Sequence, residues 1–163
     1  MAKKEYITSS PSQTKKLGEV FAKKIKKGAP KEKNARVIAL IGDLGGGKTT
    51  FLQGFAKGIG IKEKILSPTF VILKKYKIPK RIPLKRDLRG RQNTRYETLY
   101  HMDCYRIQKP SEIFNLGFQE IISDSQNLIV IEWADRIKEI IPKNATWISF
   151  TWGDDSKRKI KIF

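Results

Sequence analysis

The residues best suited to chemistry lie in one short stretch, 42–49, whose sequence is Gly-Asp-Leu-Gly-Gly-Gly-Lys-Thr. It matches the pattern G-x-x-x-x-G-K-[ST], the Walker A loop that binds phosphate groups. Its glycines allow the backbone to curl until successive N–H groups point at phosphate oxygens. Lys48 would place a cation beside the β- and γ-phosphates, and the Thr49 hydroxyl would bind Mg²⁺. The stretch therefore predicts a nucleoside triphosphate site.

The flanking residues supply the structural context that this motif requires. Residues 37–41 form an apolar run typical of a buried strand. After the loop, apolar residues from Phe51 to Ala56 share one helical face, and Gly58 is expected to end that helix. The positive end of the helix dipole would then face the bound phosphates.

Two acids stand where predicted strands end. Asp103 closes a strand at 98–103, and Glu132 follows the apolar strand 128–131. Ligands of open α/β sheets bind beyond the carboxyl ends of the strands, so both acids are expected near the loop. Hydrolysis of a nucleotide needs an acid that holds Mg²⁺ together with Thr49, and a group that orients the attacking water. The pattern alone leaves open which acid takes which role.

The other predicted elements alternate between helix and strand. They are a helix capped by Ser12 or Thr14 and ending at Gly28, a strand at 70–76, helices at 110–122 and 134–141, and a hairpin of strands 147–152 and 158–163. This order predicts an α/β fold, a P-loop NTPase-like three-layer sandwich with a mostly parallel central sheet and a C-terminal β-hairpin. The length indicates a single domain over residues 1–163, and the loop at 42–49 makes it a P-loop domain.

Composition and charge bear on the cellular location of the protein and on the kind of partner that it binds. No apolar run approaches the about 20 residues of a membrane helix, and the N-terminus lacks the apolar core of a secretory signal. Cys104 is the single cysteine, which excludes a disulfide within the chain and favours a reducing cytoplasm. We interpret Cys104 as a packing residue. The net charge of +18 indicates a polyanionic neighbour, either nucleic acid or an acidic protein, unless it reflects a general lysine bias.

Several motifs in a fixed order make the sequence resemble one family, TsaE (YjeE), over nearly the whole chain. Besides the glycine-rich loop they are Ser67-Pro68-Thr69-Phe70, His101-Met102-Asp103-Cys104-Tyr105-Arg106, Leu116-Gly117-Phe118, Ile131-Glu132-Trp133 and Ala134-Asp135-Arg136-Ile137. The loop alone is shared by many unrelated proteins, whereas this set in this order is far more discriminating.

The resemblance implies a function. Members of the family bind ATP and Mg²⁺, hydrolyse ATP slowly alone, and associate with a TsaB–TsaD pair. That assembly adds threonylcarbamoyl to the adenosine next to the anticodon of tRNA. The transfer itself belongs to TsaD, so the chain is expected to supply the ATPase cycle.

The resemblance also implies residue roles. Asp103 resembles the metal-side acid, Glu132 the water-side or Walker B acid, and Thr69 a switch hydroxyl that senses the γ-phosphate. The roles of the other polar residues in the His-x-Asp-x-Tyr-Arg motif stay open. The expected nucleotide-binding residues are Asp43, Leu44, Gly45, Gly46, Gly47, Lys48, Thr49, Thr50, Thr69 and Trp133; the expected catalytic residues are Lys48, Asp103 and Glu132; the expected metal ligands are Thr49, Asp103 and Glu132.

One segment departs from the family pattern. Residues 77–95 lengthen a connection that is much shorter in relatives, and they carry eight Lys or Arg against Asp87 alone, +7 of the total +18. We interpret the segment as a long, mobile basic loop or a loose hairpin tip, and hypothesise that it contacts tRNA phosphates or an acidic partner face. The alternative is a solvated loop without a partner. Deletion of residues 78–94 would separate the two.

Other functions fit parts of the pattern. A small-molecule P-loop kinase could use the arginine-rich segment as a lid over phosphates, but no acceptor-site signature is visible. A nucleotide-gated binding module would bind ATP without turnover. A GTPase is disfavoured because no Asn-Lys-x-Asp motif is present, so the expected base is adenine.

Overall fold

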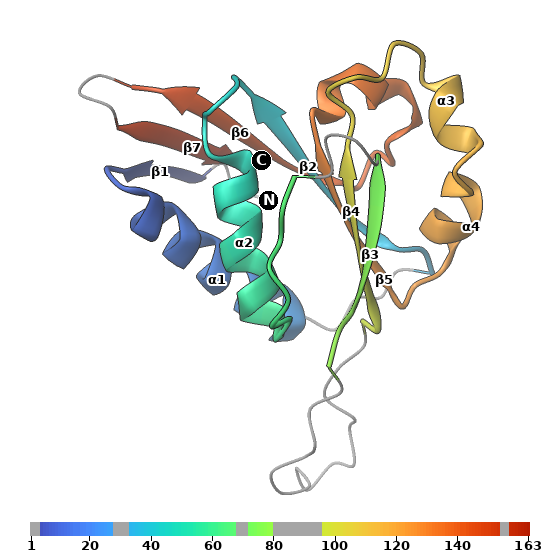
Figure 1. Cartoon of the computed structure of the whole chain (residues 1–163), viewed down its shortest axis with the longest axis horizontal. Helices are drawn as coiled ribbons and strands as arrows, with labels where there is room; N and C mark the ends of the chain where they lie inside the picture. Colours follow the sequence, from blue (N-terminus) through green and yellow to red (C-terminus); the bar gives the residue numbers. More distant parts are fainter. Residues whose placement is uncertain (1–3, 28–32, 68–71, 80–95, 154–156) are drawn as a thin grey trace, which may run out of the picture.

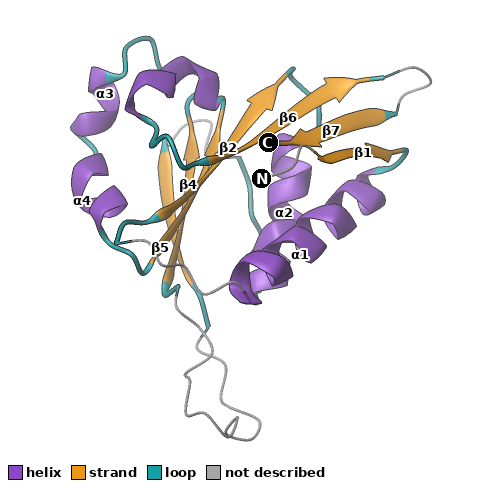
Figure 2. Cartoon of the chain, turned by 180° about the vertical axis from the view of Figure 1, so that it is seen from behind, coloured by secondary structure: helices purple, strands orange, loops and turns teal. Residues whose placement is uncertain are grey.

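The computed structural model describes residues 4–27, 33–67, 72–79, 96–153 and 157–163. Seven strands form one sheet in the order β1-β7-β6-β2-β5-β4-β3. Helices α1 and α2 cover one face, and the shorter helices α3, α4 and η1 lie on the other (Figures 1 and 2). The predicted α/β sandwich of three layers is confirmed.

The elements have the following bounds: β1 Lys4–Thr8, α1 Pro11–Lys27, β2 Arg36–Gly42, α2 Lys48–Ile59, β3 Leu73–Lys77, β4 Thr98–Asp103, α3 Ser111–Phe114, α4 Phe118–Ser123, β5 Asn127–Glu132, the 3₁₀ helix η1 Ala134–Ile140, β6 Thr146–Trp152 and β7 Arg158–Ile162. The strand predicted at 98–103 has these bounds in the structure, and the strand predicted at 37–41 is one residue longer at each end.

The centre of the sheet is parallel and its edges are antiparallel. Strands β6, β2, β5 and β4 run in the same direction, whereas β3 pairs antiparallel with β4, β7 with β6, and β1 with β7. Asp103 is the register partner of Glu132, which itself pairs with Leu40 near the end of β2. The pairing therefore brings both predicted acids to the carboxyl ends of the central strands, next to the point where the glycine-rich loop leaves β2.

Alternation along β2 divides the core between the two faces. Ile38 and Leu40 join the cluster beneath α1 and α2, and Val37 and Ala39 join the cluster on the opposite face. All six residues of β5 are buried. Apolar runs without a polar face are the pattern of parallel strands covered on both sides, and they explain why these two strands were predictable.

Helices α1 and α2 pack at glycine positions. A Cβ atom added to Gly54 would lie 1.9 Å from the carbonyl oxygen of Lys15, and one added to Gly18 would lie 2.2 Å from that of Phe51. The prediction that Gly58 ends α2 is wrong. Gly58 lies inside the helix against α1, where an added Cβ would approach Ala22 to 2.7 Å. Gly60 caps the helix instead, with φ of 101°.

Three local predictions need correction. The N-cap of α1 is Ser10, whose Oγ accepts the backbone N–H of Gln13 at 3.2 Å, rather than Ser12 or Thr14. The helix predicted at 110–122 is divided into α3 and α4 by Gly117, whose φ is 72°. Strand β1 was not predicted at all; four of its five residues are at least partly exposed, so no burial pattern indicated it.

Of the basic segment, the structure describes only the first residues, 77–79. Lys77 belongs to β3, and Ile78 is buried, with its N–H donating to the carbonyl oxygen of Glu97 at 2.8 Å. Lys77 is therefore part of the sheet rather than of a loop, and Ile78 bonds to the neighbouring chain just beyond β3. Residues 80–95 lie outside the described residues. At the other end of the chain the predicted hairpin is confirmed, because β6 and β7 pair and Gly153 N–H donates to the carbonyl oxygen of Lys157 at 2.7 Å.

Two expectations from composition can be compared with the structure. Among the described residues, no helix has both the length and the apolar character that crossing a membrane requires. Cys104 is fully buried in the cluster on the face of α3 and α4. Burial, together with the nearby Asp103 carboxylate, raises the pKa of its thiol to about 12, as expected for a packing residue.

Candidate functional site

The glycine-rich loop joins the end of β2 to the start of α2. Gly42, Gly45 and Gly47 have positive φ values of 122°, 74° and 106°. Gly42 has the strictest requirement, since an added Cβ would lie 1.9 Å from the carbonyl oxygen of Phe150 on β6. Helix α2 begins at Lys48 and has no acidic residue in its first turn. Its positive N-terminal end is therefore available to an anion held by the loop.

Lys48 lies beneath this loop and is 5% exposed. Its Nζ donates to the carbonyl oxygens of Gly42 at 2.6 Å and Asp43 at 2.8 Å. The ammonium also lies 3.9 Å from the ring centroid of Trp133. Burial lowers the pKa of Lys48, and nearby carboxylates, that of Glu132 first, act in the opposite direction. The loop thus encloses a cation among carbonyl oxygens, an indole and acids.

Glu132 at the end of β5 meets the loop directly. The Thr49 hydroxyl lies 2.8 Å from Oε2 and 3.0 Å from Oε1 of Glu132 and donates to this carboxylate. His101, fully buried on β4, donates from Nε2 to Oε1 at 2.9 Å. An ionised carboxylate only accepts hydrogen bonds, so His101 must carry its proton on Nε2. Its Nδ1 has no hydrogen-bond partner within the described part of the chain.

Asp103 lies beside Glu132 but has different partners. Its Oδ1 accepts the backbone N–H of Tyr105 at 3.0 Å, and its Oδ2 accepts the hydroxyl of Ser67. Two donors from separate segments therefore hold this carboxylate at the end of β4. Among the described residues the Thr49 hydroxyl bonds to Glu132 and not to Asp103, so the structure distinguishes two acids that the sequence pattern left equivalent.

Trp133 follows Glu132 in an unusual backbone conformation. With φ of 57° it is the one non-glycine residue with positive φ among the described residues. Its ring lies 5.0 Å from that of Tyr105, centroid to centroid, and the guanidinium of Arg136 approaches both rings. The conformation turns the indole towards Lys48, and such strain is common where a structure fixes a functional side chain.

Most of these groups line one pocket of about 310 Å³, although His101 and Arg136 do not. Of the predicted site residues it includes Leu44, Gly45, Gly47, Lys48, Thr49, Thr50, Asp103, Glu132 and Trp133. Asp43 and Gly46 belong to the loop without lining the pocket, and Thr69 lies outside the described residues. Sequence reasoning missed Ser67 as a partner of Asp103 and His101 as a partner of Glu132, although both residues stand in the motifs that carried the resemblance.

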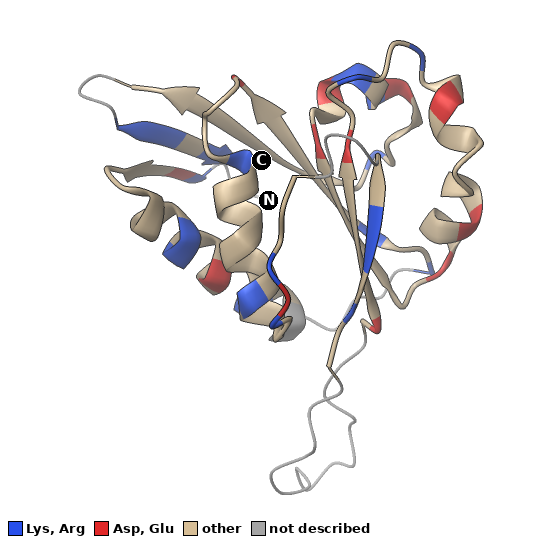
Figure 3. Cartoon of the chain, in the orientation of Figure 1, with Lys and Arg blue, Asp and Glu red and all other residues tan. Residues whose placement is uncertain are grey.

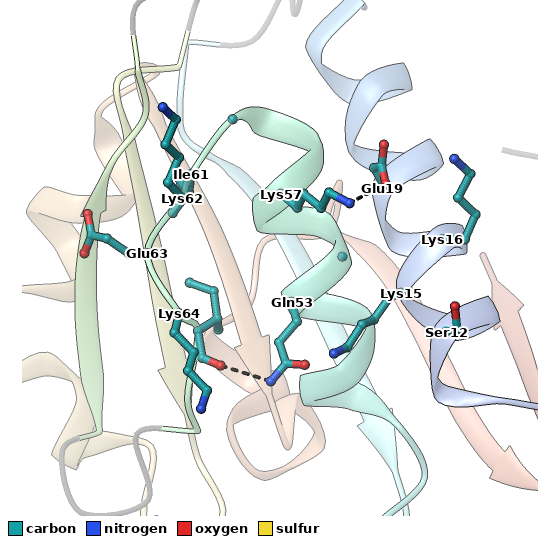
Figure 4. Close-up of a pocket in the computed structure, with 13 residues that line it drawn as sticks. Ser12, Lys15, Lys16, Glu19, Gln53, Lys57, Ile61, Lys62, Glu63 and Lys64 are labelled. Atoms are coloured by element: carbon teal, nitrogen blue, oxygen red, sulfur yellow. Dashed lines mark hydrogen bonds and ion pairs between the residues drawn. The ribbon is translucent and has the colours of Figure 1, made fainter.

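A larger hollow of about 960 Å³ lies along α1, α2 and the segment after α2 (Figure 4). Five lysines line it: Lys15, Lys16, Lys57, Lys62 and Lys64. Glu19 offsets part of this charge and lies 3.8 Å from Lys57 Nζ. None of the predicted site residues lines this hollow. Basic positions also mark β3 and β7, whereas acidic ones stand at the carboxyl ends of β4 and β5 (Figure 3).

Comparison with known proteins identifies the family. The family model described as "Threonylcarbamoyl adenosine biosynthesis protein TsaE" matches residues 8–160. A protein of Bacillus subtilis named tRNA threonylcarbamoyladenosine biosynthesis protein TsaE is 35% identical over 98% of this chain and 85% of its own length. Proteins of the same name from Rickettsia bellii and Treponema pallidum are each 33% identical, over 99% and 96% of this chain and over 96% and 97% of their own lengths.

A solved structure agrees with these sequence relatives. The crystal structure of Bacillus subtilis YdiB superposes with a TM-score of 0.64 and 29% identity, covering 98% of this chain and 84% of that one. The family model and the relatives all span nearly the whole chain, including the loop, both acids and the hairpin. The chain therefore belongs to the TsaE family.

Proposed function

We propose that this chain is a Mg²⁺-dependent ATPase that supports threonylcarbamoylation of tRNA together with homologues of TsaB and TsaD. The observation that carries the ATPase part is the hydrogen bond from Thr49 to Glu132 beside the buried ammonium of Lys48. This bond joins two side chains that a P-loop ATPase needs at its phosphates, and Lys48 adds the cation beside them. Membership of the TsaE family supports the tRNA pathway and its partners.

Phosphate binding would use groups that already converge on the loop. The first turn of α2 follows the loop and has no acidic residue, and Lys48 adds a positive charge beneath the loop. Lys48 now donates to two neutral carbonyl oxygens. An ionised phosphate oxygen is a stronger hydrogen-bond acceptor than a carbonyl oxygen. Replacing the two hydrogen bonds of Lys48 to carbonyl oxygens with hydrogen bonds to phosphate is therefore favourable.

The residues present fit magnesium. Thr49, Glu132 and Asp103 offer hydroxyl and carboxylate oxygens, the hard donors that Mg²⁺ prefers. Within the described residues no three His, Cys, Asp or Glu side chains cluster as a metal cage. That matches a Mg²⁺ that relies on one or two carboxylates, waters and substrate phosphates. When bound, the ion would neutralise negative charge on the phosphates.

The two acids would have different roles, one at the metal and one at the attacking water. The resemblance implied Asp103 on the metal side, but the contact of Thr49 with Glu132 supports Glu132 in that position. His101 would hold the Glu132 carboxylate in place. Asp103, fixed by Ser67 and the N–H of Tyr105, would then orient the attacking water.

The substitutions Glu132→Gln and Asp103→Asn test this division. We expect Glu132→Gln to raise the Mg²⁺ concentration needed for ATP binding, because a neutral amide is a poorer metal ligand. We expect Asp103→Asn to bind ATP and Mg²⁺ normally and to lower the hydrolysis rate by about 100-fold or more. Calorimetric Mg²⁺ titration and ADP release measure the two effects. Exchanged phenotypes would reverse the roles, and unaltered hydrolysis in both variants would refute the proposed ATPase site.

A further inference from the structure

Three residues form a row across the neighbouring strands β6, β7 and β1. Trp152 ends β6 and pairs with Arg158 at the start of β7, which in turn pairs with Thr8 at the end of β1. Directly paired residues carry their side chains on the same face of a sheet. Thr8 Oγ1 lies 2.8 Å from Thr14 Oγ1 of α1, so the row faces the layer of α1 and α2.

Trp152 and Arg158 lie against the glycine-rich loop. A Cβ atom added to Gly47 would lie 3.1 Å from Cδ of Arg158, and one added to Gly45 would lie 3.6 Å from Cζ2 of Trp152. Both side chains are therefore within contact distance of the loop that is proposed to hold phosphates. They reach it from β6 and β7, which Figure 1 shows on one side of β2.

The acids approach from the opposite side. Glu132 and Asp103 come from β5 and β4, which follow β2 in the other direction through the sheet. The metal and the water would therefore occupy the β5 side of the loop. A nucleotide whose terminal phosphates face these acids must extend its ribose and base elsewhere, and the β6 side offers the row of Trp152 and Arg158.

The chemistry of this row suits an aromatic base. Trp152 is 46% exposed, a high value for a tryptophan, and its indole meets solvent next to the loop. The guanidinium carbon of Arg158 lies 4.9 Å from the ring centroid of Trp152, where a cation–π contact helps to fix the indole. Arg158 Nε is buried and has no hydrogen-bond partner among the described residues, so it is an unused donor beside the loop.

We propose that Trp152 and Arg158 form the subsite for the purine base of the nucleotide. The exposed indole of Trp152 stacks on the base, and Arg158 holds the indole in position. Stacking on an aromatic side chain accepts any base, because every base has a π-face. The proposal rests on the proposed function, since it takes the loop as the phosphate site, but it concerns different side chains and makes a separate prediction.

Comparison of ATP with inorganic tripolyphosphate isolates the base. Both ligands carry three linked phosphates, and only ATP has a base. By calorimetry in the presence of Mg²⁺, we expect Trp152→Ala to weaken ATP binding about tenfold, a typical loss of one stacking contact, and to leave tripolyphosphate binding within twofold. Trp152→Phe should retain most of the ATP affinity. Ile7→Ala, which removes another exposed apolar side chain on the neighbouring strand β1, should change neither ligand.

Arg158 gives an independent test. Arg158→Lys keeps the charge and loses the planar guanidinium, so ATP binding should weaken more than tripolyphosphate binding. If the Trp152 or the Arg158 variant binds ATP and tripolyphosphate more weakly by the same factor, the base subsite is overturned. The row would then support the loop or bind phosphate. Unchanged ATP affinity in Trp152→Ala would also overturn it. If the unmodified protein binds neither ligand, the proposed function itself fails and the subsite fails with it.

Discussion

At the scale of single residues, Lys48 shows how a buried charge is kept in a small protein. Two carbonyl oxygens of its own loop and the face of Trp133 replace water around the ammonium. Burial nevertheless lowers the pKa of Lys48. Its ammonium therefore loses its proton at a lower pH than that of an exposed lysine. Phosphate affinity is accordingly expected to fall as the pH rises through this lowered pKa.

The substitution Lys48→Ala measures the contribution of this cation. We expect tripolyphosphate affinity to fall by about 100-fold, because one or two charged hydrogen bonds to phosphate disappear. Calorimetry at neutral pH checks the value. Lys62→Ala, in the basic hollow and away from the loop, is the matched control and should retain affinity within twofold. Similar losses in both variants would mean that general positive charge, rather than the loop, binds the phosphates.

Cys104 allows a second prediction at this scale. Its pKa is raised to about 12, so almost none of it is thiolate at pH 8. The folded protein should therefore resist alkylation by iodoacetamide for hours, and unfolding in urea should return the thiol to ordinary reactivity. Mass spectrometry of native and unfolded samples measures the difference. Rapid labelling of the native protein would contradict a buried packing role.

The sequence predicted which side chains gather at the site but not how they bond. The loop pattern and the strand ends were sufficient to select Lys48, Thr49, Asp103 and Glu132, because local patterns place such residues at one sheet edge. The bonds from Thr49 and His101 to Glu132 join residues 83 and 31 positions apart. The first bond depends on the register of β2 against β5 and the second on that of β4 against β5, and no local pattern specifies either register.

At the scale of elements, the close packing of α1 and α2 depends on glycines without side chains. Alanine normally stabilises a helix relative to glycine by about 1 kcal/mol. In Gly54→Ala, however, the new Cβ would lie 1.9 Å from the carbonyl oxygen of Lys15. Relief of this clash requires a shift of the backbone of α1, which disturbs the packing of the two helices. We expect the packing loss to prevail and the free energy of unfolding to fall by about 2 kcal/mol. Urea denaturation measures it.

Gly153→Ala is the control for this prediction. Gly153 has no positive φ, and an added Cβ would lie 3.5 Å from the carbonyl oxygen of Lys157, an ordinary contact distance. Its substitution should change the free energy of unfolding by less than about 1 kcal/mol. A Gly54→Ala variant as stable as the natural chain would show that α1 and α2 can separate slightly without loss.

Elements differed in how far the sequence could predict them. Strands β2 and β5 were recognisable because both of their faces are buried and their apolar runs are continuous. Strand β1 was missed because it is an edge strand, held by pairing with β7 and mostly exposed. Gly58 was predicted to end α2 because glycine often ends a helix, but its packing against α1 keeps it inside the helix, and Gly60 is the cap.

At the scale of the whole molecule, the strand order gathers the loop, the two acids and the row of Trp152 and Arg158 at one end of the strands. Strand β2 brings the loop, β5 and β4 bring the acids on one side, and β6 and β7 bring Trp152 and Arg158 on the other. The basic segment leaves the sheet elsewhere, between β3 and β4. Its ends are adjacent, because Ile78 bonds to Glu97. A short linker can therefore replace residues 80–95 without disturbing the buried side chains of Ile78 and Tyr96.

That replacement tests the hypothesis that the basic segment contacts tRNA or an acidic partner. With residues 80–95 exchanged for a short Gly-Ser linker, we expect unchanged ATP binding and weaker binding of tRNA or of the TsaB–TsaD pair at low salt, because six or more positive charges are lost. Fluorescence anisotropy measures both affinities. A variant with the arginines of this segment changed to glutamine separates charge from length. Unaltered affinities in both variants would leave the segment without a binding role.

The central claim is that this member of the TsaE family supplies partner-dependent ATP hydrolysis. The most direct measurement is Mg²⁺-dependent ADP release by the protein alone, by the protein with an active TsaB–TsaD pair, and by the Asp103→Asn variant with the same pair. We expect slow release alone, clear stimulation by the pair, and loss of that stimulation in the variant. Verified ATP binding without any stimulation by an active pair would contradict the claim.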